Sequence, residues 1–397
     1  MRQPRLMVVT AGLCLIVAGC GATETSPATD GDRPPQRLLQ TPVEFPSPFS
    51  VIRAVMALPD GRLVVSDAQE NRVALIDFLK GTSRQLGRVG EGPREFRRAG
   101  GLYRRPGGGV AIFDQELRRI LPVLPSGALH DVLGLPTSGR ADTWSARGPD
   151  VLSFDSLSST YAARRFGGFT APTSVLVRYR PGVRPDTITE LLRPLTEAFN
   201  ASPSGAGTYQ EVLFSPEDAW AVAPDGWIAV MRASPYRVEW IPPAGPGITG
   251  PVITHQPVPI SQAEKELIAS GAAGSRGRTI VTMGLVPAGG LPPQSGSGTP
   301  TPIPVEDLLF AKIKTPVNLR SGRWPVLDES GRLWVQRNLP AESKAPVFDV
   351  FDRAGNLVTR IELPAGSRLV AFDSRWIYLA RVDSDDLEHL QRFPLPR

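Results

Sequence analysis

The fold of this chain is decided by the stretch Pro59-Asp60-Gly61-Arg62-Leu63-Val64-Val65-Ser66-Asp67. Residues 106–114 repeat its pattern, and Arg72-Val73 and Arg119-Ile120 follow the two copies at the same distance. An Asp-Gly pair favours a tight turn in which glycine takes positive φ. The alternating apolar residues after the turn predict a β-strand that buries one face.

Further copies recur along the chain. They are residues 224–230 and 328–335, with weaker copies at 149–155 and 372–378, which makes six in all. After each strong copy a second strand follows, and glycine-bearing turns then recur at Gly81, Gly127, Gly182, Gly245 and Gly355. This order is typical of a four-stranded propeller blade, and a repeat of roughly 40–50 residues favours the same fold. The sequence therefore predicts an all-β, six-bladed β-propeller over residues 49–397; an open β-sandwich with chance Asp-Gly turns is the alternative.

The composition agrees with many short strands. The 397 residues include 41 Pro and 39 Gly, and 41% are hydrophobic, which is ample for a buried core. The formal net charge is +5, and Arg2 and Arg5 of the N-terminal segment supply part of it. The remaining excess is small and gives no reason to expect a nucleic-acid partner.

Residues 1–19 have the pattern of an export signal. Arg2 and Arg5 precede an apolar stretch from Leu6 to Ala18, which is too short to span a bilayer as a helix. The sequence Val17-Ala18-Gly19-Cys20 resembles the lipobox of bacterial lipoproteins, which implies cleavage after Gly19 and lipid attachment to Cys20. Ordinary cleavage near Ala22 is the alternative. We expect residues 20–48, rich in Pro, Ser, Thr, Asp and Gly, to form a flexible tether. The lipoprotein would be exported and membrane-anchored, at the outer membrane, its periplasmic face or the cell surface.

A family resemblance rests on residues 87–96, Gly-Arg-Val-Gly-Glu-Gly-Pro-Arg-Glu-Phe, together with the strand pattern at 60–67. The segment resembles the inter-blade segment of NHL-repeat and TolB-like six-bladed propellers. The resemblance implies a ligand- or protein-binding scaffold, although some relatives are lactonases or lyases. The longest irregular spacing, 246–315, predicts an insertion. Within it, Ser261 to Glu264 form a capping box, residues 305–313 could form a second helix, and residues 284–304 read as a loop.

The sequence shows no catalytic motif. The three histidines, His130, His255 and His389, lie in no metal-ligand motif, and no nucleophile elbow occurs. We therefore expect no cofactor and no metal ligands. Asp67, Asp114 and Asp155 recur by repeat position, which favours turn capping, although a ring of acids could bind a cation.

Arginines are concentrated at residues 84–119, a stretch that contains nine arginines and four acidic residues. This excess suggests an anion-binding site that includes Arg88, Arg94, Arg97 and Arg98; a solvated arginine-rich face is the simpler explanation. We expect a monomeric binding scaffold for an envelope protein or glycan, without catalysis. A metal-dependent lactonase or hydrolase is the alternative.

Overall fold

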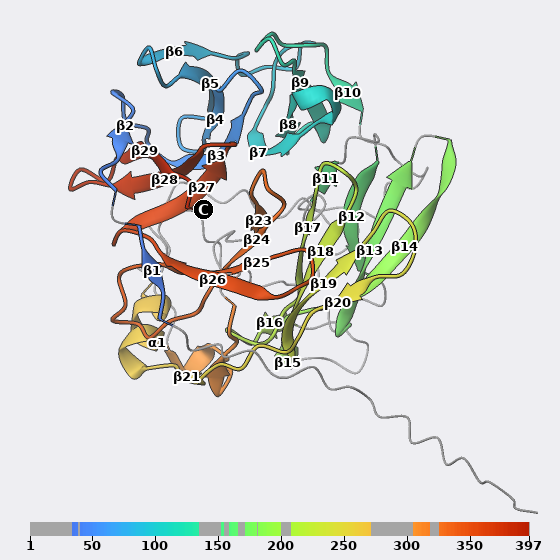
Figure 1. Ribbon diagram of the computed structural model, residues 1–397, viewed down its shortest axis with the longest axis vertical. Coiled ribbons are helices and arrows are strands. Elements are labelled where there is room, and N and C mark those ends of the chain that lie inside the picture. Colours follow the sequence, from blue (N-terminus) through green and yellow to red (C-terminus); the bar gives the residue numbers. More distant parts are fainter. Residues whose placement is uncertain are drawn as a thin grey trace, which may run out of the picture.

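The computed structural model describes residues 34–38, 40–134, 152–154, 159–165, 171–180, 182–199, 208–270, 305–317 and 325–396. Half of the chain is strand and 4% is helix, and six sheets stand as blades around one axis (Figure 1). The first strand of each blade contacts the first strand of the next, from β27 through β3, β7, β11 and β17 to β23. The predicted six-bladed β-propeller is confirmed.

Consecutive segments form the first four blades, each running from the axis outward. Blade one is β3 (Ile52–Ala57), β4 (Leu63–Asp67), β5 (Arg72–Asp77) and β6 (Thr82–Gln85). Blade two is β7 (Ala99–Arg104), β8 (Val110–Asp114), β9 (Arg119–Val123) and β10 (Leu133–Gly134), with the 3-10 turn η1 (Pro106–Gly108). Blade three is β11 (Leu152–Phe154), β12 (Thr160–Arg165), β13 (Thr173–Arg180) and β14 (Val183–Leu192). Blade four is β17 (Ala219–Val222), β18 (Ile228–Ala233), β19 (Tyr236–Ile241) and β20 (Ile248–Thr249).

Blades five and six each receive a strand from the N-terminal segment. Blade five is β23 (Val326–Leu327), β24 (Leu333–Gln336), β25 (Val347–Phe351) and β26 (Leu357–Glu362), and β1 (Gln36–Arg37) pairs with β26 in parallel. Blade six is β27 (Ser367–Phe372), β28 (Trp376–Val382) and β29 (Glu388–Pro394). Its outer strand is β2 (Val43–Glu44), antiparallel to β29. The ring is therefore closed by pairing the two ends of the chain, which leaves fewer exposed sheet edges.

This closure moves the domain boundary. Residues 36–37 and 43–44 lie in the segment 20–48 that the sequence assigned to a tether, yet they pair with blades five and six. Phe45 is 1% exposed and packs against the rings of Phe49 and Phe78. The propeller therefore begins before residue 49. The parts of the chain that would hold the signal and Cys20 lie outside the described residues.

The repeated turns define the two ends of the ring. Gly61, Gly226 and Gly331 have φ between 81° and 84°, and each joins the first strand of a blade to the second. In each, the glycine amide donates to the carbonyl oxygen three residues earlier. We call the end of the ring with these turns the turn face, and the opposite end, where the first strands begin, the start face. The weak copy at 149–155 falls elsewhere, because Leu152–Phe154 forms the first strand of blade three and not the second.

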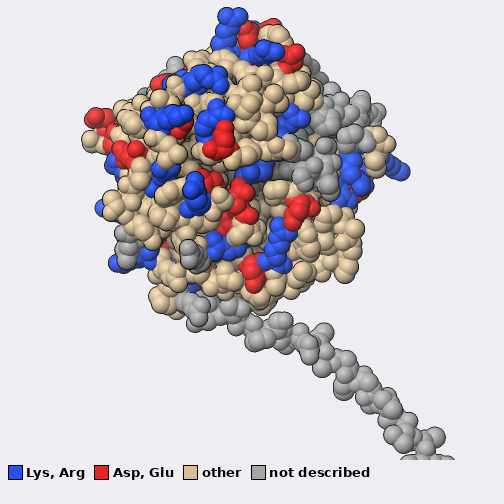
Figure 2. Space-filling model, turned by 45° about the horizontal axis from the view of Figure 1, so that its top comes forward, with Lys and Arg blue, Asp and Glu red and all other residues tan. Residues whose placement is uncertain are grey.

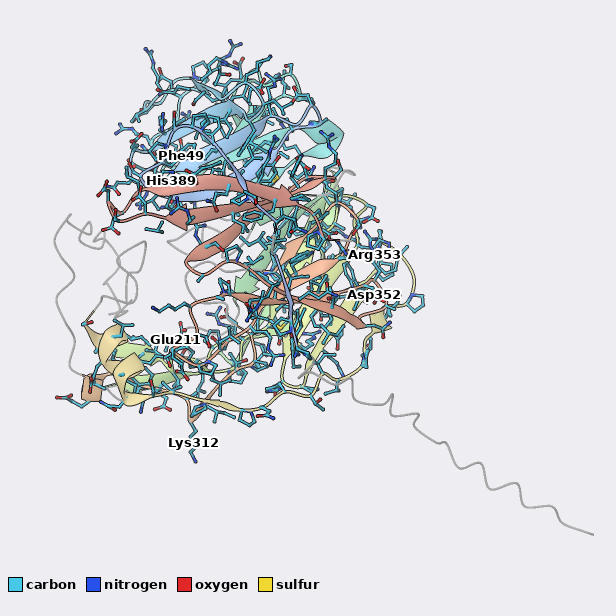
Figure 3. All side chains as sticks on the ribbon, turned by 60° about the vertical axis from the view of Figure 1, so that its left-hand side comes forward. Phe49, Glu211, Lys312, Asp352, Arg353 and His389 are labelled. Atoms are coloured by element: carbon cyan, nitrogen blue, oxygen red, sulfur yellow. The ribbon has the colours of Figure 1, made fainter. Side chains whose placement is uncertain are left out.

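Two segments follow the fourth strands of blades three and four, and the second of them lies within the predicted insertion 246–315, whereas the first was not predicted. The first is the hairpin β15 (Thr196–Phe199) and β16 (Thr208–Glu211); the second holds β21 (Val258–Pro259), α1 (Gln262–Ala269), η4 (Val305–Asp307) and β22 (Ile313–Lys314). They share a small core built from Phe214, Ile268 and Leu308. Figures 1 and 3 show α1 at one margin of the ring.

Of three predictions about the insertion, the structure confirms one. The predicted helix begins at its capping box, since the Glu264 amide donates to Ser261 Oγ at 3.2 Å. The second predicted helix is limited to η4 and is followed by β22. The predicted start at residue 246 is too early, because β20 (Ile248–Thr249) belongs to blade four. Residues 271–304 lie outside the described part.

Candidate functional site

The recurring aspartates cap the backbone at the start face. Asp67 accepts hydrogen bonds from the amides of Ser50, Val51, Gln69 and Glu70 at 2.8–3.2 Å. Asp114 accepts the four corresponding amides, of Arg97, Arg98, Glu116 and Leu117, at 3.0–3.3 Å. Both carboxylates are buried. Turn capping, the first of the two roles considered for these residues, is therefore confirmed for Asp67 and Asp114, whereas Asp155 lies outside the described residues.

Three of the four arginines proposed for anion binding have acidic partners. Arg88 Nε lies 2.5 Å from Glu95 Oε1, and Arg94 Nε lies 3.1 Å from Asp131 Oδ1. Arg97 pairs with Glu91. Figure 2 shows basic and acidic side chains interspersed over the surface that it views. For these three positions, the structure favours the explanation of a solvated, charge-paired face.

The glycine-rich segment 87–96 is a closed loop around its own side chains. The Glu95 carboxylate accepts the Gly92 amide at 2.8 Å, and a Cβ at Gly90 would lie within 3 Å of that carboxyl group. The Arg119 guanidinium donates to the carbonyl oxygens of Glu91, Gly92 and Glu95 at 2.9–3.1 Å. The loop is therefore a structural link between blades one and two.

Arg98 differs from the other three arginines. It immediately precedes β7, and among the described residues no carboxylate is recorded within salt-bridge distance of its guanidinium. Its charge lies close enough to Arg53, on the first strand of blade one, to lower the pKa of Arg53, although burial of Arg53 by surrounding protein is the larger cause. Arg53 also has no recorded carboxylate partner in the described part of the chain, and its side chain still reaches solvent. Arg53 and Arg98 are therefore two exposed cations near the starts of neighbouring first strands, β3 and β7, at the start face.

Two adjacent glycines make room beside this pair. Gly100 and Gly101 lie on β7, where a Cβ at Gly100 would be 2.5 Å from Gln115 Cγ. A Cβ at Gly101 would be 2.7 Å from the Tyr103 hydroxyl oxygen. Tyr103 is near enough to Arg53 to affect its pKa. The two glycines thus let the side chains of Gln115 and Tyr103 pack against β7. We call Arg53, Arg98, Tyr103 and Gln115 the axial cluster.

The opposite end of the axis is crossed by an ion pair. Arg104, the last residue of β7, lies 2.5 Å from Glu329, in the turn between β23 and β24. These residues belong to blades two and five, which face each other across a ring of six. The pair therefore ties the ring together at the turn face, at the opposite end from the axial cluster.

The histidines lie in separate places. His130 Nδ1 is 3.2 Å from a backbone oxygen, the His255 ring packs edge-on against Tyr236, and His389 lies between two carboxylates. Within the described ranges, no three His, Cys, Asp or Glu side chains are grouped as they would be around a metal ion. No described helix has the length and apolar character needed to cross a membrane.

Comparisons with known proteins find solved structures of low sequence identity. No protein-family model matches the sequence, and no curated protein matches it. Solved structures with a similar fold include a virginiamycin B lyase from Staphylococcus aureus, at 9% identity and TM-score 0.36, covering 90% of this chain and 88% of that one. A gluconolactonase from Xanthomonas campestris has 13% identity and TM-score 0.40, covering 94% and 99%. A calcium-binding protein, regucalcin, from Agrobacterium tumefaciens has 11% identity and TM-score 0.37, covering 88% and 95%.

At such identities and scores no residue role is carried over to this chain. The finer resemblance to NHL-repeat propellers stays a prediction.

Proposed function

We propose that this protein is an exported, monomeric binding scaffold that holds an anionic ligand at the axial cluster. The observation that carries the proposal is the pair of neighbouring guanidinium groups, Arg53 and Arg98, without a recorded carboxylate partner among the described residues. Like charges at close range repel each other, and a bound anion would remove that cost. Carboxylate and phosphate groups match the planar fork of arginine, and charge-assisted hydrogen bonds are the strong ones.

The ligand class follows from the surroundings of the pair. Tyr103 and Gln115 add a hydroxyl and an amide, which suit the neutral polar groups of a sugar or a peptide. An acidic glycan or an acidic protein segment at the cell envelope therefore fits this cluster. Glucuronate, a sugar with one carboxylate, is a suitable probe, and neutral glucose is its matched control.

The proposal is tested by isothermal titration of glucuronate and glucose at low and high salt. We expect binding of glucuronate alone, weakened by salt, and a loss of about tenfold or more in Arg53→Gln and Arg98→Gln, since a charge-assisted hydrogen bond contributes about 1.5–3 kcal/mol. Arg94→Gln is the control, because Arg94 is exposed and paired with Asp131. Equal affinity in Arg53→Gln and wild type, or no binding of glucuronate, would overturn the assignment.

The anchor is the second part of the proposal. The lipobox-like residues 17–20 support attachment of lipid at Cys20, and the described chain enters the ring at β1, on the outer edge of blade five. Labelled palmitate should be incorporated into the full-length protein and be lost in Cys20→Ala. Incorporation that survives this substitution would show that the anchor is elsewhere.

A metal-dependent lactonase or hydrolase is the second candidate, because neighbours with this fold include proteins described as a gluconolactonase and a lyase. It predicts stoichiometric divalent metal in protein purified without chelators, and metal-stimulated opening of a lactone. Replacement of the three histidines together by alanine should leave glucuronate binding unchanged if the scaffold proposal is right.

A further inference from the structure

One histidine lies where β2 pairs with blade six, which we call the seam of the ring, and this histidine has a carboxylate on each side. His389, on β29, has Nδ1 2.8 Å from Glu44 Oε1 and Nε2 2.6 Å from Asp383 Oδ2. Glu44 belongs to the closing strand β2, whereas Asp383 lies between β28 and β29. In Figure 3, His389 lies beside Phe49, whose backbone forms a bridge with Glu388. The imidazole therefore joins the closing segment to blade six.

The closing strand is also held by the buried Phe45 ring and by the Phe45 amide, which donates to the Leu390 carbonyl oxygen at 2.9 Å. β2 is two residues long, and its register pairs Val43 with Arg392 and Glu44 with Gln391. The second carboxylate oxygen of Glu44 accepts Gln391 Nε2 at 2.8 Å and lies 3.4 Å from Arg381 Nη2. The side chain of Glu44 thus supplies a large share of the polar contacts that hold β2 in the sheet.

The geometry points to a proton-dependent latch: the charged form of His389 fastens the closing strand to blade six, and loss of its proton loosens the strand. An imidazole can donate from both nitrogens only when it is charged. In the neutral ring, one nitrogen would turn a lone pair toward a carboxylate. Arg381, on β28, is opposite His389 in the sheet register and lies 3.4 Å from Glu44, and Asp385 and Asp386 follow Asp383 in the turn between β28 and β29.

The pKa values of the two carboxylates determine how far the pH can fall before the latch is lost. The hydrogen bond from His389 is the main cause that holds the pKa of Asp383 below its ordinary value. The pKa of Glu44 is also lowered: burial acts in the opposite direction, but the hydrogen bond from Gln391 and the charge of His389 outweigh it. Lowered carboxyl pKa values give stability that is present above about pH 4 and is lost as the pH falls through the folded values. The latch therefore needs both carboxylates in their charged form, which limits it on the acid side.

Hydrogen exchange of the full chain tests the latch, with the protection of residues 40–49 measured at pH 5.5 and 8.5 and corrected for intrinsic rates. We expect protection of this segment to fall about five- to tenfold at the higher pH in the wild type. His389→Gln should have the lower protection at both values, and the remote variant His130→Gln should behave as wild type. Unchanged wild-type protection, or an undiminished pH effect in His389→Gln, would overturn the proposal.

A second variant covers the case in which His389→Gln does not fold. Glu44→Gln keeps the size of the side chain but removes the charge that faces His389 Nδ1, so the pH effect on residues 40–49 should shrink to about half or less. A full pH effect in Glu44→Gln would show that Glu44 is not a partner in the latch. The prediction concerns the seam alone and does not depend on the axial cluster.

Discussion

Replacing Asp67 by Asn separates the two roles that the sequence allows for the recurring aspartates. Oδ1 of Asp67 accepts the amides of Val51, Gln69 and Glu70, and Oδ2 accepts the Ser50 amide at 2.8 Å, the shortest of the four. An asparagine can keep its oxygen toward the first three amides. Its NH2 group would then face the Ser50 amide, which places two donors against each other.

The expected cost follows from these bonds. A hydrogen bond to a charged group contributes about 1.5–3 kcal/mol, so Asp67→Asn should lower the free energy of unfolding by about 2–3 kcal/mol. Asp67→Ala, which removes all four acceptor contacts, should cost about 4–5 kcal/mol. Asp114→Asn should cost at least as much, because its two oxygens share the four amides in the same way and its Oδ2 also lies 3.5 Å from Arg119 Nε.

Urea unfolding followed by circular dichroism measures these changes. Asp131→Asn is the control: Asp131 is 62% exposed and pairs only at the surface with Arg94, so its loss should change stability by about 0.5 kcal/mol or less. If the aspartates instead held a cation, EDTA would destabilise the wild type and calcium would restore it. Stability of Asp67→Asn within about 0.5 kcal/mol of wild type would refute the capping argument.

Two further substitutions and one pH titration test other parts of the structure. Phe45→Ala should lower stability by about 3–5 kcal/mol, since this ring is buried in the closing segment, whereas Val43→Ala, at a 47% exposed position, should be nearly neutral in urea unfolding. Burial, with Asp373 as the next cause, raises the pKa of Tyr378 well above its ordinary value, so stability should fall as the pH rises above about 10, and ultraviolet titration should show Tyr378 ionising only on unfolding. Gly101→Ala should cost about 1–3 kcal/mol and weaken glucuronate binding, because its Cβ would displace Tyr103; calorimetry measures both effects.

The sequence was sufficient for the blades because their signal is local. Gly61, Gly226 and Gly331 all take the positive φ that an Asp-Gly or Ser-Gly turn predicts. The prediction that the strands after them bury one face is wrong, because second strands such as β4 pack against a neighbouring blade on each face. The closing strand β2 carries no such signal. It has two residues in a polar segment, and its pairing depends on β29 near the other end of the chain. A strand defined by a distant partner cannot be recognised from its own sequence.

The candidate site shows a similar limit. A count of charges over residues 84–119 identified an excess of arginine but could not show which arginines are paired. Arg94 finds its partner in Asp131, outside that window, and Arg53, the neighbour of Arg98, also lies outside it. The repeat position of Arg53, early in the first strand of a blade, is the signal that could have identified it, since first strands face the axis.

Four acidic side chains at the start face and in the loop between blades one and two are held by their own partners and not by the axial cluster. Asp67 and Asp114 are occupied by backbone amides, which the strand starts of blades one and two require. Glu91 and Glu95 lie in the loop between those blades and pair with Arg97 and Arg88 there. These four acids are thus bound to the framework, whereas Arg53 and Arg98 have no carboxylate partner within salt-bridge distance in the described chain. A positive charge left over in this way, on rigid first strands and beside two glycines, is the arrangement that a preorganised anion site needs.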